Sequence, residues 1–136
     1  SDLWERPATR FAAGFLGATN RLSGIVEGVG TGSLMLAVDD GPRLALPAGA
    51  PVAAGDRATA FIRTGAVLLL DQPPATATNV MPVDVTGQTF HGDYAIVTVR
   101  LGRGVLKVKV DRLLDSRSAR RHIHLDPARL HVFRDS

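Results

Sequence analysis

Residues 79–110 read NVMPVDVTGQTFHGDYAIVTVRLGRGVLKVKV, and this stretch decides the fold class of the chain. Over 106–110 two lysines alternate with leucine and valine, and this period of two predicts a strand with one face toward a core and one toward water. Over 94–99 both alternating sets are mostly apolar, which predicts a strand covered on both faces. We therefore expect three strands in succession, in a closed or curled sheet rather than an open ribbon.

Glycine-containing turns separate these strands. His91-Gly92-Asp93 and Gly102-Arg103-Gly104 are the predicted turns, because glycine reaches positive φ at little steric cost. Asp39-Asp40-Gly41 is a hairpin turn of the same kind, between strands predicted over 33–38 and 43–46. Fourteen glycines and eight prolines in 136 residues indicate many short strands. Only 5% of the residues are aromatic, so the core must consist of Val, Leu, Ile and Ala.

Composition excludes several protein classes. Hydrophobic residues make up 45% and charged residues 21%, which is typical of a globular protein. Cysteine is absent, so neither a disulfide framework nor a thiolate metal site can form. No apolar run approaches the roughly 20 residues that span a bilayer, and no secretory signal peptide is visible. The chain begins with Ser1 rather than Met, so we expect it to be a piece of a longer protein.

The two halves of the chain repeat one another. Asn20 and Asn79, which are 59 positions apart (79 minus 20), each precede a similar succession of strands and turns. The sequence thus predicts two similar β-units over 20–71 and 79–136, intertwined into one body. Further strands are predicted over 25–29, 57–63, 67–70, 122–125 and 130–133.

One helix is predicted, over residues 4–16. Its apolar stripe includes Trp4, Phe11 and Phe15 at helical spacing, Pro7 suits the first turn, and Gly17 suits the end. The stripe packs either on its own domain or on a neighbouring domain absent from this chain, and the sequence leaves both alternatives open. Residues 1–19 are then a junction, and 20–136 form the β-domain.

No recognised catalytic motif is present, so we assign no catalytic residue. The chain lacks G-x-x-x-x-G-K-[ST], G-x-S-x-G and H-E-x-x-H. His122 and His124 share a strand face and could bind a metal with His131 or Asp126. We favour solvent-facing histidines on an edge strand, and assign no metal site. The basic residues Arg117, Arg120 and Arg121 have no interleaved aromatics, which favours a solvated loop over a nucleic-acid surface.

A small oxyanion is the ligand that the sequence could hold. Arg100, Arg103 and Lys107 lie near glycine-containing turns, whose backbone N–H groups can bind an anion. The simpler interpretation, ordinary hairpin turns with solubilising charges, is favoured. His91 is expected to be exposed, and Phe61 and Phe90 are expected to belong to the core.

Two stretches resemble a known family. Residues 3–20, LWERPATRFAAGFLGATN, resemble the junction that follows the nucleotide-binding domain in ATPase subunits of bacterial ABC importers. Residues 80–110 and the closing 125–133, LDPARLHVF, resemble the C-terminal regulatory domain of those subunits, named TOBE for transport-associated OB. The similarity is strongest to the polyamine and iron importers. One departure is that Arg63 is followed by Thr64 and Gly65, where the family often has Pro-Glu.

The resemblance implies an all-β, OB-like barrel fold of the TOBE/MOP type with one N-terminal helix. It implies a non-catalytic regulatory and dimerisation domain, cytoplasmic and peripheral at the inner membrane face. Trp4, Phe11 and Phe15 would contact the nucleotide-binding domain, which would hold ATP and magnesium. The other partners would be a second copy of the domain and, indirectly, the permease, but no nucleic acid. The alternatives are an oxyanion- or sugar-binding barrel and an OB-type nucleic-acid binder.

Overall fold

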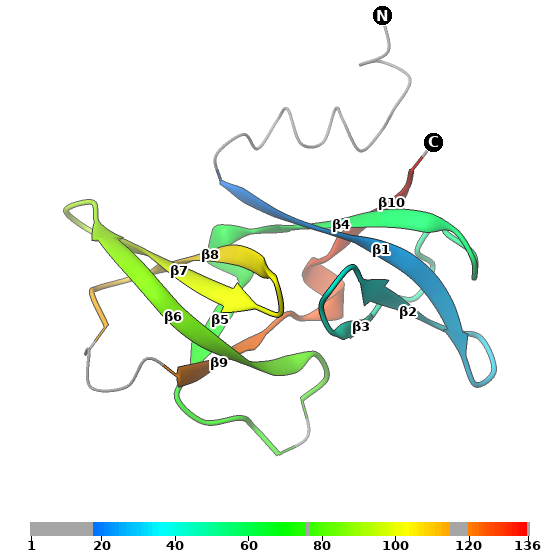
Figure 1. Ribbon diagram of the computed structural model, residues 1–136, viewed down its shortest axis with the longest axis horizontal. Helices are drawn as coiled ribbons and strands as arrows, with labels where there is room; N and C mark the ends of the chain where they lie inside the picture. The colour runs from blue at the N-terminus through cyan, green and yellow to red at the C-terminus, as the bar shows by residue number, and fades with distance from the viewer. Residues whose placement is uncertain (1–17, 76, 115–119, 136) are drawn as a thin grey trace, which may run out of the picture.

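The protein's structure, a computed structural model, describes residues 18–75, 77–114 and 120–135. Its described part consists almost wholly of antiparallel strands in two five-stranded sheets, shown side by side in Figure 1. The first sheet contains β1 (Thr19–Val29), β2 (Ser33–Val38), β3 (Arg43–Ala45), β4 (Arg57–Arg63) and β10 (His131–Arg134). The second contains β5 (Leu68–Leu70), β6 (Val80–Phe90), β7 (Ala95–Leu101), β8 (Gly104–Val110) and β9 (Arg120–His124). The helix predicted over 4–16 lies outside the described residues.

The predicted three-strand succession is confirmed as β6, β7 and β8, which pair in that order. On β8, Leu106 and Val108 are buried whereas Lys107 and Lys109 are exposed, as the alternation requires. The turns also fall where the glycines predict them, with φ of 94° at Gly92 and 60° at Gly102. The period-two pattern therefore predicted correctly that these segments are strands, and which face of β8 is buried.

The two halves are intertwined by exchanging their last strands. The strand orders are β10-β4-β1-β2-β3 and β5-β9-β6-β7-β8. Replacing each strand by its counterpart in the other half converts the first order into the second. Short 3₁₀ turns hold equivalent positions, with η2 (Thr64–Ala66) after β4 and η3 (Pro127–Arg129) after β9. The predicted all-β fold of two similar intertwined units is thus confirmed.

Two asparagines join the exchanged halves at the free edges of the sheets. The Asn20 side chain accepts a hydrogen bond from the Lys107 backbone N–H and donates one to its carbonyl, both at 2.8 Å. Asn79 makes the equivalent pair with Ala45, at 2.7 and 3.0 Å, and donates to the Leu125 carbonyl. Each amide therefore substitutes for a neighbouring strand at the edge of β8 or β3, which satisfies backbone groups that an edge leaves open.

Aliphatic side chains from both sheets form one core. Its largest fully buried side chains are Leu36, Leu44, Ile62, Leu106, Ile123, Leu125, Val26, Val67, Val97, Val99 and Val108. Phe61 is buried, as predicted, and its ring meets Phe133 edge to face. The prediction that Phe90 belongs to the core is wrong, because 56% of this residue is exposed. It ends an 11-residue strand whose last five residues project beyond the core with the β6–β7 hairpin (Figure 1).

Backbone segments approach closely where glycine removes the side chain. A Cβ built on Gly24 would lie 2.0 Å from the Ala37 carbonyl oxygen on the paired strand β2. At Gly102 the corresponding atom would lie 2.4 Å from the Asp40 carbonyl oxygen, which accepts a hydrogen bond from the Arg103 N–H. The β7–β8 turn therefore packs directly on the β2–β3 turn. The described residues include no helix with the length and apolar character needed to cross a membrane.

Candidate functional site

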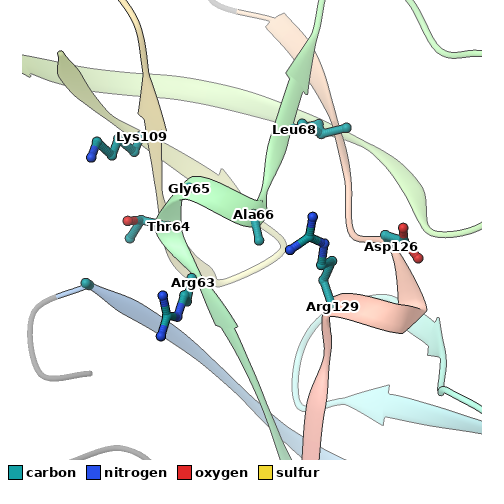
Figure 2. Close-up of a pocket in the computed structure, with 9 residues that line it drawn as sticks. Arg63, Thr64, Gly65, Ala66, Leu68, Lys109, Asp126 and Arg129 are labelled. Carbon is teal, nitrogen blue, oxygen red and sulfur yellow. The ribbon is translucent and has the colours of Figure 1, made fainter. Parts of the chain in front are cut away.

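A pocket of about 500 Å³ opens where η2 and η3 approach one another (Figure 2). Hydrogen bonds from backbone N–H groups hold the two turns that line it. Thr64 N–H donates to the Ala18 carbonyl at 2.9 Å, which ties η2 to the start of β1. Asp126 caps η3 by accepting from the Ala128 N–H at 2.9 Å. The lining residues are Ala18, Arg63, Thr64, Gly65, Ala66, Leu68, Lys109, Asp126 and Arg129.

Positive charge dominates this pocket. Three of its lining residues, Arg63, Lys109 and Arg129, are basic, and Asp126 is acidic. In Figure 2 the Arg129 side chain extends from η3 toward Ala66, whereas Asp126 points away on the other side of the turn. Arginine at such a position can bind a carboxylate or phosphate through two parallel hydrogen bonds. The arrangement can therefore hold an anion.

The pocket is also partly apolar, and one of its basic residues, Lys109, contacts an aromatic ring. Ala18, Ala66 and Leu68 contribute carbon surface to the lining, and Leu68 is 50% exposed. The Lys109 ammonium lies 4.5 Å from the centroid of the Tyr94 ring, which in turn stacks on His91. Outside the pocket, the hydrogen bond to Asp39 raises the pKa of Arg57.

The predicted oxyanion residues occupy a different surface. Arg100 and Lys107 share the outer face of the second sheet, since Arg100 is opposite Val105 and Lys107 lies two residues beyond. Arg100 forms an ion pair with Asp84 at 3.2 Å, and Arg103 lies in the β7–β8 turn. A smaller hollow of about 400 Å³ is lined by residues that include Arg100, Asp84, Pro82 and Gly102. An oxyanion site at Arg100, Arg103 and Lys107 stays a prediction.

Two predictions about the basic and histidine-containing segment are wrong. His122 and His124 do share a face, but β9 lies between β5 and β6 and is not an edge strand. Arg121 is not in a solvated loop, because it belongs to β9, is 9% exposed and contacts Asp71 at 3.0 Å. Both errors arise because β5, from the other half of the chain, pairs with β9. The described residues contain no group of three or more His, Asp or Glu suited to a metal ion. Arg117 lies outside the described part.

The sequence analysis did not predict that Arg63, Lys109 and Arg129 line one pocket. Arg63 and Arg129 are more than sixty positions apart, and the exchange of strands brings their turns together. The repeat contained a usable indication, since η2 and η3 follow equivalent strands. Aligning the two halves would have shown that both turns lie at corresponding places.

Comparison with solved structures shows which fold the chain has. The fold matches that of ModG, described as a cytoplasmic molybdate-binding protein, with a TM-score of 0.70 and 19% identity. The match covers 86% of this chain and 96% of the ModG chain, so the chain has the OB-like fold of the TOBE/MOP type over most of its length. No protein-family profile matches the chain.

The chain is also similar in sequence to a transport protein. The chain is 29% identical over 107 residues to the putrescine transport ATP-binding protein PotG of Escherichia coli K12. The match covers 76% of this chain but 28% of PotG, so the chain spans about a quarter of the relative's length. Together the two comparisons confirm the resemblance to the TOBE domain of an importer ATP-binding subunit.

Proposed function

We propose that this chain is the non-catalytic regulatory domain of the ATP-binding subunit of an ABC-type solute importer. The observation that carries the proposal is the similarity to PotG over 76% of the chain. The OB-like fold of exchanged units agrees with a TOBE domain. The sequence lacks a phosphate-binding loop of the G-x-x-x-x-G-K-[ST] type, which supports placing ATP and magnesium in a separate nucleotide-binding domain.

In this role the domain is a rigid cytoplasmic body, peripheral at the inner membrane face. Each sheet contains a strand from the other half, so the halves cannot separate without unpairing both β5 from β9 and β10 from β4. Such a body is suited to holding two ATPase subunits in register through a second copy of itself. Trp4, Phe11 and Phe15 are the proposed contacts with the nucleotide-binding domain, and the permease is reached indirectly through it. Nucleic acid is not a proposed partner.

A chimera tests this function. The segment of PotG that matches this chain would be replaced by the chain, and ATP hydrolysis and putrescine import would be measured beside intact PotG. We expect the chimera to hydrolyse ATP and support import, and the 136-residue chain alone to do neither. ATP turnover by the pure chain would contradict the proposal. So would a chimera that folds and joins its permease but neither hydrolyses ATP nor supports import.

A further inference from the structure

We propose that the pocket between η2 and η3 binds a small organic carboxylate, with the anionic head on Arg129 and the apolar body over Leu68 and Ala66. The head is assigned to Arg129 because its side chain extends toward Ala66 along the pocket (Figure 2). A guanidinium can pair with a carboxylate through two parallel hydrogen bonds. Lys109 and Arg63 add positive charge at the rim.

The charge of the lining favours an anion. Its basic members are Arg63, Lys109 and Arg129, whereas its one acidic member, Asp126, caps η3. Coulombic attraction therefore favours anions in general, and the choice among anions depends on the size and the apolar surface of the pocket.

The size and lining favour an organic ligand over a bare oxyanion. At about 500 Å³ the pocket lies within the roughly 300–1,000 Å³ range of sites for organic molecules. Ala18, Ala66 and Leu68 offer no hydrogen bonds, so they cannot replace the water around an inorganic anion. They can cover an alkyl chain, and that contact would remove the half-exposed Leu68 from water.

The two halves of the internal repeat differ at this pocket. Lys107 and Ala45 have the same role toward Asn20 and Asn79, so Lys109, two residues further along, corresponds to Pro47. The first half thus lacks the cation that β8 supplies to this pocket. The two lining turns come from different halves, so a ligand here contacts both and would stabilise their union.

Titration of the full 136-residue chain tests the proposal. Calorimetry would compare acetate, butanoate, hexanoate and molybdate at fixed ionic strength and pH. Each buried methylene contributes to binding, so we expect hexanoate to bind at least about tenfold more tightly than acetate, and also more tightly than molybdate. Arg129→Met should weaken hexanoate binding at least about tenfold, and Lys109→Met should weaken it less. Arg134→Met, an exposed arginine outside the pocket, is the matched control and should bind normally.

Amide chemical-shift mapping locates the site without any variant. Hexanoate should shift the amides of Thr64, Gly65, Ala66 and Leu68 before those of β8 residues facing Arg100. Molybdate binding as tight as hexanoate binding, equal affinity across the carboxylates, or unchanged affinity in a folded Arg129→Met variant would overturn the proposal. None of these outcomes bears on the PotG chimera, so failure of the carboxylate site and failure of the regulatory role are separable.

Discussion

At the scale of single residues, Asn20 and Asn79 stabilise the fold through hydrogen bonds from their side chains to backbone groups of other strands. Asn79 makes three hydrogen bonds to backbone groups of Ala45 and Leu125, and its φ is 60°. Asn79→Ala loses these bonds and places alanine in the left-handed region, so we expect a loss of about 2–4 kcal/mol in unfolding free energy. Urea denaturation followed by circular dichroism measures it.

Glycine at the same position separates the two causes. Asn79→Gly also removes the hydrogen bonds, but glycine adopts the left-handed backbone conformation without strain. It should therefore be about 1 kcal/mol less destabilising than Asn79→Ala. Equal stabilities for the two variants would show that the backbone angle contributes nothing. The equivalent Asn20→Ala, on an ordinary strand, should lose about 1–3 kcal/mol through its two bonds to Lys107.

Gly24 and Gly28 form a matched pair on β1. A Cβ at Gly24 would meet the Ala37 carbonyl oxygen at 2.0 Å, whereas at Gly28 it would meet only the Ala54 Cβ at 3.8 Å. Gly24→Ala must push β1 and β2 apart, and we expect a loss of more than about 3 kcal/mol. Gly28→Ala should change stability by less than about 1 kcal/mol in either direction. Thermal unfolding of both variants checks this, and similar melting temperatures would contradict it.

At the scale of elements, the sequence predicted strands better than it predicted their partners. The alternation over 106–110 and the Asp39-Asp40-Gly41 turn placed β8 and the β2–β3 hairpin, because such patterns depend on neighbouring residues. The pairing of β9 with β5 was missed, because it joins segments about fifty residues apart and no local pattern encodes it. The basic pocket was missed for the same reason, since the exchange alone brings η2 to η3.

The β6–β7 hairpin gives a prediction at this scale. Phe90 ends the strand beyond the core and is 56% exposed, whereas Phe61 on β4, which lies between β10 and β1, is 3% exposed. We expect Phe90→Ser to lower the unfolding free energy by less than about 1 kcal/mol, and Phe61→Ala to lower it by about 3–5 kcal/mol. Chemical denaturation measures both changes. A large loss from Phe90→Ser would mean that this side chain is covered in the folded protein.

At the scale of the whole molecule, the exchange of strands makes the two halves one cooperative unit. The first sheet is incomplete without β10, and the second is incomplete without β5. Separate fragments 1–75 and 76–136 would each leave core residues such as Ala60 or Ile123 without the covering strand. We therefore expect each fragment alone to lack the circular dichroism spectrum of a stable β-sheet. An equimolar mixture should regain that spectrum at a rate that rises with fragment concentration, as in a bimolecular reaction.

The matched control for this prediction is the folded chain cleaved at one peptide bond in the exposed segment 71–75, with the two fragments left associated. Because the nick breaks no strand pairing, the nicked protein should melt in one transition close to that of the intact chain. Amide exchange would then show similar protection for β1 and β6, since opening either sheet requires the exchanged strand to leave. A fragment that folds alone with protected amides, or an intact chain whose sheets melt at separate temperatures, would show that the halves are independent domains that merely touch.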